Sequence, residues 1–198
     1  MSLMSLPKMF VSETEGWSDL VRIHPSVRRL FMFFVAPMSL LPPVMHAYAQ
    51  LEAPGAVFPS LAPVLALQEA VIVGGVFFLI ELATVTLMAY YIQQMADSFG
   101  VPTDYPSAYT LAAVAPTPLW VASLALFIPS LWFNVAVLVV AWVASAALIR
   151  HGVRPILRAP DSPHAHKLAN AITLVGVLAW IGLIMVMVLM LGMLIGLR

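Results

Sequence analysis

Long apolar runs make up most of the chain, and short polar segments separate them. Five of these runs are near the roughly 20 residues that an α-helix needs to cross the hydrocarbon of a bilayer. The pattern therefore predicts an all-α integral membrane bundle of five transmembrane helices. They cover about residues 30–48, 64–92, 107–128, 131–149 and 168–197.

Proline content and length distinguish these runs from one another. The first contains Pro37, Pro42 and Pro43, so we expect a kinked or broken helix there. The second has no proline and is predicted to be the longest uninterrupted helix. The fifth is longer than a single span needs, so its helix should tilt or project from the membrane.

The first 27 residues are the most polar stretch, and four apolar side chains recur in them at helical spacing. We predict a short amphipathic helix on the membrane surface that ends near His24 and Pro25, with a disordered tail as the alternative. The chain then divides into a cytoplasmic, partly amphipathic segment, residues 1–27, and a five-span membrane domain, residues 28–198. The four apolar side chains are Trp17, Leu20, Val21 and Ile23.

Composition excludes several other classes of protein. Apolar residues make up 62% of the chain and charged residues only 9%, a balance that a soluble domain of this size cannot bury. The formal net charge of zero argues against nucleic acid as a partner. Because the chain has no cysteine, disulfides, thiolate catalysis and cysteine metal sites are excluded.

The basic side chains gather in two places, before the first span and between the fourth and fifth spans. With five spans, both groups lie on the same side of the membrane, which is cytoplasmic by the positive-inside rule. The N-terminus is then cytoplasmic, and the C-terminus with Arg198 is external. The two groups are Lys8, Arg22, Arg28 and Arg29, and Arg150, Arg154, Arg158 and Lys167.

A secretory signal peptide is a rival interpretation of the first span. Arg28 and Arg29 precede an apolar run that ends in residues 47–49, Ala-Tyr-Ala, which resemble a cleavage site. The long polar lead and the three prolines are unusual for such a peptide, so we expect the span to be retained. Cleavage would leave the topology of the other four spans unchanged.

Glu81 lies near the middle of the second span, where a carboxylate costs about 2.5 kcal/mol or more to insert. Helical spacing places it on a stripe of apolar and small residues, so we expect it to face protein. In that stripe, Ala70 and Gly74 form a small-xxx-small pair that lets another helix approach closely. The stripe comprises Ala70, Gly74, Phe78, Glu81, Val85 and Met88.

No Lys or Arg lies inside any span to pair with Glu81, and two interpretations stay open. In the structural one, the buried carboxyl is protonated and bonds a neighbouring helix. In the functional one, it carries a proton or binds a cationic ligand. The polar candidates for contact with it are Thr84, Thr86, Thr110, Thr117 and Asn134.

Pro116 and Pro118 stand in the middle of the third span, on either side of Thr117. Each proline removes a backbone donor and frees a carbonyl in the preceding turn, which in lipid has to face protein, water or a hydroxyl. We expect a bend here, with the Thr117 hydroxyl near the freed carbonyls. The bend serves either helix packing or, as in the broken helices of transporters, a binding site.

Few other residues point to chemistry. His164 and His166, with Asp161 nearby, form at most a weak metal site, and their spacing is typical of a solvated loop. Gly192 and Gly196 match the G-x-x-x-G pattern and suggest a helix-packing or dimer face. No catalytic or nucleotide-binding motif is present, so no catalytic residue, cofactor or metal is predicted.

Several short motifs follow one another in a recognisable order along the chain. The most specific is Thr117-Pro118-Leu119, followed by a proline hairpin into the next span. Over about residues 24–195, the chain resembles bacterial members of the Yip family, the Rab/Ypt-interacting membrane proteins. The motifs are His24-Pro25, Leu41-Pro42-Pro43, Pro106-Ser107-Ala108, the run 115–120, and Ile128-Pro129-Ser130-Leu131-Trp132.

The resemblance implies a five-span protein with a cytosolic N-terminal segment. Eukaryotic relatives are adaptors that bind prenylated Rab GTPases and vesicle-coat machinery and that pair with one another. The N-terminal segment of this chain is too short for their cytosolic domain, so Rab binding is not carried over. The resemblance supplies no catalytic residue.

We therefore expect a non-enzymatic scaffold, adaptor or accessory subunit in the cytoplasmic (inner) membrane of a bacterium. Its expected partners are membrane lipids and other membrane proteins or a second copy of itself. The alternative is a small transporter or an ion- or proton-conducting protein built around Glu81 and the proline-broken third span.

Reporter fusions test the predicted orientation. A reporter placed after Asp104 or Asp161 should be cytoplasmic and one after Arg198 external, because eight of the nine Lys and Arg side chains then face the cytoplasm. Paired reporters that are active on opposite sides of the membrane provide the measurement. A cytoplasmic C-terminal reporter would contradict the five-span topology.

Overall fold

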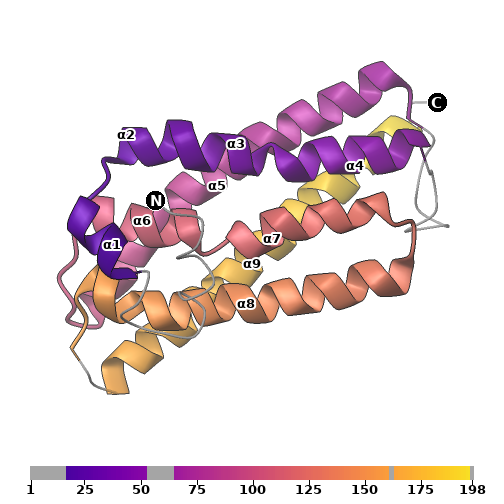
Figure 1. Cartoon of the computed structure of the whole chain (residues 1–198). Coiled ribbons are helices and arrows are strands. Elements are labelled where there is room, and N and C mark those ends of the chain that lie inside the picture. The colour runs from indigo at the N-terminus through magenta and orange to yellow at the C-terminus, as the bar shows by residue number, and fades with distance from the viewer. Residues whose placement is uncertain (1–16, 53–64, 161–162, 197–198) are drawn as a thin grey trace.

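A computed structural model describes residues 17–52, 65–160 and 163–196, and every regular element in these ranges is a helix. Five helical segments are long and apolar enough to cross a membrane, as predicted. Figure 1 shows the segments packed side by side as one bundle, with α1 (Trp17–Ile23) at one end. The five are Val27–Glu52, Leu67–Ser98, Tyr105–Phe127, Leu131–Leu157 and Pro163–Leu194.

The first span consists of four short helical segments, which confirms the predicted interruption. Pro37 has no backbone N–H to donate, and the turn that precedes it widens into a π-helix. A second break follows at Leu40, shortly before Pro42 and Pro43. The segments are α2 (Val27–Leu30), η3 (Phe31–Val35), α3 (Ala36–Ser39) and α4 (Leu41–Glu52).

The two longest helices are α5 (Leu67–Ser98) and α9 (Pro163–Gly196), with 32 and 34 residues. The prediction that the second span is the longest uninterrupted helix is therefore wrong. The fifth helix gains length because it begins at Pro163, several residues before its apolar run, and proline is well accommodated in a first helical turn. Figure 1 shows α9 running obliquely to α8.

The third span is interrupted in its middle and joined to the fourth by a tight hairpin. The side-chain amide of Asn134 stabilises this hairpin by donating to the carbonyls of Ile128 and Ser130, at 2.9 and 2.8 Å. α8 ends at Arg158, which adopts the left-handed conformation with φ of 56°. The elements are α6 (Tyr105–Val114), α7 (Thr117–Ala122), the 3₁₀ helix η4 (Ser123–Phe127) and α8 (Leu131–Leu157).

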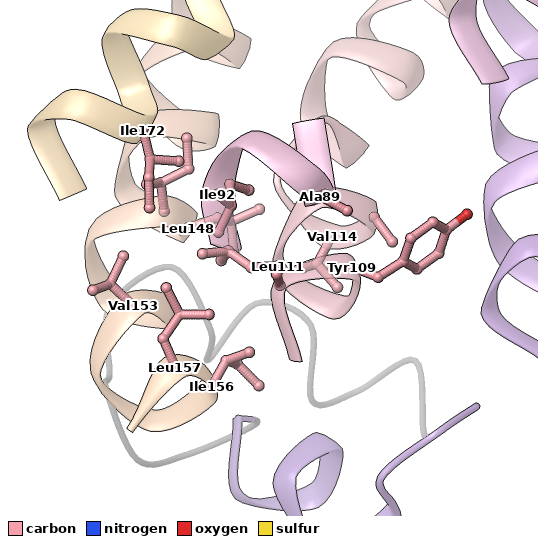
Figure 2. Close-up of a cluster of buried hydrophobic side chains, with 14 of the residues drawn as sticks. Ala89, Ile92, Tyr109, Leu111, Val114, Leu148, Val153, Ile156, Leu157 and Ile172 are labelled. Carbon is pink, nitrogen blue, oxygen red and sulfur yellow. The ribbon is translucent and has the colours of Figure 1, made fainter. Parts of the chain in front are cut away.

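The apolar core is densest near the end of the bundle that carries α1. Side chains of α5, α6, α8 and α9 meet there, as Figure 2 shows. In a bilayer, such close packing holds helices together through dispersion, because lipid tails are as apolar as the core itself. The labelled side chains are Ala89, Ile92, Tyr109, Leu111, Val114, Leu148, Val153, Ile156, Leu157 and Ile172.

The short helix α1 packs against α8 at this end. It forms where the amphipathic pattern predicted a helix and ends before His24, but its apolar face contacts protein instead of the membrane surface. Trp17 and Leu20 are only 0% and 3% exposed. Gly152 of α8 makes the contact possible, because it has no side chain to occupy the space that the Trp17 ring fills.

Substitution of Gly152 tests this docking. An alanine Cβ there would lie 2.6 Å from Cη2 of Trp17 and 2.8 Å from Cδ1 of Leu111, so α1 has to shift. We expect Gly152→Ala to lower the free energy of unfolding by about 1–3 kcal/mol, the usual cost of overpacking. The melting temperature of the purified protein in mild detergent provides the measurement.

Gly75→Ala is the matched control, because an alanine Cβ at this position in α5 meets nothing within 4 Å. Alanine is favoured over glycine inside a helix by up to about 1 kcal/mol, so its melting temperature should hold or rise. Equal changes in the two variants would show that Gly152 has no special role.

Candidate functional site

Glu81 lies in the middle of α5 and faces the interior of the bundle. Its side chain is only 6% exposed, which agrees with the expectation that it points at protein. The buried stripe of α5 differs slightly from the predicted one, because Phe77 and Ala89 occupy it while Phe78 and Met88 lie half-buried at its edge. The stripe comprises Ala70, Val73, Phe77, Glu81, Val85, Ala89, Ile92 and Ala96.

Trp120 of α7 is the partner of Glu81. The indole Nε1–H donates to Oε1 of the carboxyl at 2.5 Å, and Trp120 itself is 2% exposed. Phe34 of η3 packs edge-on against the same indole, with ring centroids 6.3 Å apart. The first three spans therefore meet at this carboxyl. Chemically, one carboxyl and one indole donor form an interhelical bond, and Oε2 has no partner among the described residues.

None of the five polar candidates forms a hydrogen bond with Glu81 in the described part of the chain. Hydroxyls inside helices commonly bond a carbonyl one turn back, and three of the five threonine and asparagine side chains do this. Asn134 bonds within its hairpin, and the Thr117 hydroxyl has no partner in the described part of the chain. The three back-bonded pairs are Thr84 to Ile80, Thr86 to Leu82 and Thr110 to Pro106.

The break in the third span positions Trp120. α6 ends at Val114, Pro116 precedes α7, and Pro118 stands in the first turn of α7, where no backbone donor is needed. The carbonyl of Pro116 accepts from the N–H of Trp120 at 3.1 Å. The Thr117 hydroxyl does not bond the freed carbonyls, contrary to expectation. The new helix direction instead brings the indole to Glu81.

The glycine positions predicted for helix packing have different surroundings. Ala70 is 2% exposed, and a Cβ built at Gly74 would meet Pro43 of α4 at 3.7 Å, so the first span approaches α5 closely there. At Gly192, no atom of the described chain lies within 4 Å of such a Cβ. Gly196 is the last residue of α9. Gly192 therefore makes no close helix contact within the described part of the chain.

The histidine pair lies in the exposed first turn of α9. His164 and His166 are both exposed, while Asp161 lies outside the described residues. Within residues 17–52, 65–160 and 163–196, no group of three or more His, Asp or Glu side chains is placed to hold a metal ion.

A second polar cluster lies at the α1 end of the bundle, far from Glu81 in the fold. Arg158 and His24, which both have positive φ angles, approach each other at 3.3 Å between Nη2 and Nε2. They line a cavity of about 50 Å³ together with Asp104 and Ser107. The hydrogen bonds from Ser107 hold the pKa of Asp104 below its usual range, and the charge of Arg158 acts in the same direction. These contacts cap α6 and fasten the end of α1.

Comparison with known proteins identifies a family. A family model described as the Yip1 domain matches residues 8–190, almost the whole chain. Neither the curated proteins nor the solved structures contain a match. The match extends through all five spans and includes α1, Glu81 and Trp120.

Substitutions of Glu81 test the bond to Trp120. Glu81→Gln keeps an acceptor oxygen for the indole, so the melting temperature in mild detergent should be nearly unchanged. Glu81→Leu removes the acceptor and should cost about 0.6–2 kcal/mol, the worth of an interhelical bond in a membrane.

Trp120→Phe extends this comparison, because it removes the donor and keeps an aromatic ring. The double variant Glu81→Leu with Trp120→Phe should be destabilised by less than the sum of the two single effects, since the pair is coupled. Strictly additive effects would contradict a direct bond.

Proposed function

The chain belongs to the Yip1 domain family, and from that membership we propose that it is a non-enzymatic membrane scaffold or adaptor. It acts through contacts between helix faces inside the bilayer, with other membrane proteins or with a second copy of itself. We place it in the cytoplasmic membrane of a bacterium, with residues 1–27 on the cytoplasmic side. Basic side chains near α1 and the α8–α9 connection support that orientation.

The surroundings of α9 carry this proposal. The most apolar 18-residue window of this span has no residue buried within the chain, whereas the other spans have 22–39% of theirs buried. α9 contacts α5 and α8, yet most of its membrane surface is left for lipid or for another helix. Its large exposed side chains include Leu174, Leu178, Met185, Val188, Leu189 and Met193.

Small residues make this surface suitable for a partner helix. Cβ atoms built at Gly176, Gly182 and Gly192 would meet nothing within 4 Å, so another backbone has room to approach closely. The exposed methionines beside them are unbranched and adapt to the shape of a partner. A scaffold that recruits proteins within the membrane needs such a face more than it needs a polar pocket.

Glu81 fits the same interpretation. A carboxyl that joins the second and third spans through Trp120 stabilises the arrangement of the bundle on which the α9 surface depends. The role proposed for Glu81 here is therefore structural, and Gln should replace it without loss of partner binding.

Capture of partners from solubilised membranes tests the proposal. The tagged full-length protein, purified in mild detergent, should retain a stoichiometric membrane protein or a second copy, identified by quantitative mass spectrometry. The double variant Leu189→Ala with Met193→Ala, at side chains 63% and 69% exposed, should lower recovery about tenfold, which corresponds to ~1.4 kcal/mol of lost contact.

Leu79→Ala is the matched control, because this side chain is similarly exposed, at 64%, but belongs to α5. It should leave recovery unchanged, and so should Glu81→Gln. If no partner is retained and proton-coupled flux in liposomes disappears on Glu81→Gln, the scaffold proposal is wrong and a transporter takes its place.

A further inference from the structure

The interface between the first span and α5 contains buried polar atoms that have no hydrogen-bond partner among the described residues. Three belong to the first span, and the fourth is the second oxygen of Glu81. Ser39, Gln50 and Glu81 are 0%, 8% and 6% exposed, so neither lipid headgroups nor bulk solvent satisfies them. The atoms are Oγ of Ser39, Nε2 of His46, Oε1 of Gln50 and Oε2 of Glu81.

Helical spacing places these atoms on facing surfaces. Positions 43, 46 and 50 recur every three or four residues and share one face of α4, and Ser39, just before the break at Leu40, is buried like Pro43 and Gln50. Pro43, within that series, lies opposite Gly74 of α5, where a Cβ would be 3.7 Å from it. Gly74 and Glu81 are two helical turns apart and share a face of α5. The two polar surfaces therefore meet along the same interface.

Ser39 and Glu81 also lie at the same depth in the membrane. Ser39 is thirteen residues before the end of α4 at Glu52, and Glu81 is fourteen residues after the start of α5 at Leu67. At the helical rise per residue, both are about 20 Å from that end of the bundle. Gln50 lies within one turn of it. The unpartnered atoms thus form a series from the bundle end to mid-membrane.

The series stops at Glu81. The next buried positions of α5 toward the other end are Val85, Ala89 and Ile92, and all three belong to the apolar core. Figure 2 shows Ala89 and Ile92 among the close-packed side chains of that core. Along the buried stripe of α5, polar side chains therefore stop at Glu81.

We propose that this interface binds a file of water molecules that extends from Gln50 to Glu81 and ends there. Water can form a hydrogen bond, as donor or acceptor, with each of the four groups: a hydroxyl, an imidazole nitrogen, an amide oxygen and a carboxyl oxygen. A divalent cation fits the interface less well, because only one of the four side chains is a carboxyl. Gly74, without a side chain, lets Pro43 of the first span approach α5, so the two polar faces lie close together.

The water file has two consequences for the molecule. It completes the hydrogen bonds of both helices, which hydrocarbon cannot do. It also gives Glu81 contact with water from the membrane face where α4 ends and α5 begins, while the apolar core separates it from the opposite face. Access from one side is what distinguishes this arrangement from a continuous pore.

Single cysteines test the proposal cleanly, because the chain has no cysteine of its own. Ser39→Cys and Gln50→Cys should react with a small charged methanethiosulfonate in nanodiscs at least about tenfold faster than controls, since a thiolate forms only where water reaches. The controls are Val35→Cys, on the same face of the first span, and Val85→Cys, one turn beyond Glu81. Both native side chains are buried, at 0% and 4% exposed.

A second substitution tests the route. Gly74→Val, at a depth between Gln50 and Ser39, should slow the reaction of Ser39→Cys and leave that of Gln50→Cys unchanged. If it slows neither reaction, or both equally, water does not enter along this interface and the proposal is overturned. Equal rates for the test and control cysteines overturn it as well.

Hydroxyl-radical footprinting of the unsubstituted protein provides a measurement that needs no variant. The radicals form from water beside a side chain, so His46 should be oxidised despite its buried ring nitrogen. Leu111, 0% exposed in the apolar core, is the comparison residue and should be protected. Protection of His46 to the same degree would contradict a hydrated interface.

Discussion

A polar group inside hydrocarbon has no solvent to bond, so the protein itself has to provide a partner for it. This constraint determines the architecture of the chain. All regular structure in the described ranges is helical, because a helix satisfies its backbone internally. Pro118 stands in a first helical turn, where its missing donor costs nothing, and the proline-broken third span brings an indole N–H to Glu81.

The same constraint divides the bundle into two parts. Toward α1, the helices meet mainly through apolar side chains, and close packing accounts for their association (Figure 2). Toward the opposite end, the first span and α5 carry Ser39, His46 and Gln50 between them, at atoms that the described chain leaves unpaired. Glu81 lies at the boundary between the two parts. One of its carboxyl oxygens accepts a hydrogen bond from Trp120, and we propose that the other bonds water.

The fifth span differs from the others because its membrane part contributes little to the core. A helix with no buried residue in its most apolar window gains less from its own chain than the other spans do and leaves many large apolar side chains exposed. Under the proposed function, that surface is the one that recognises a partner, and the first four spans position it in the bilayer.

The local features of this protein were predictable from sequence. Five apolar runs of sufficient length predicted the five spans, and Pro37 and Pro116 predicted interruptions in the first and third spans. The family resemblance followed from the order of short motifs along the chain. Each depends on residues close together in the chain. Helix α1 was predictable for the same reason, although its docking against Gly152 was not.

Long-range pairing was decided only by the tertiary structure. The bond from Trp120 to Glu81 joins residues 39 apart, and no spacing rule distinguishes Trp120 from the threonines that were better candidates by polarity. Three of those threonines bond their own helices because a carbonyl one turn back is in reach, whereas the indole has no acceptor in its own turn. Which polar side chains bond each other therefore depends on how the helices pack. That packing brings together residues that are far apart along the chain, so their contact cannot be predicted from sequence spacing.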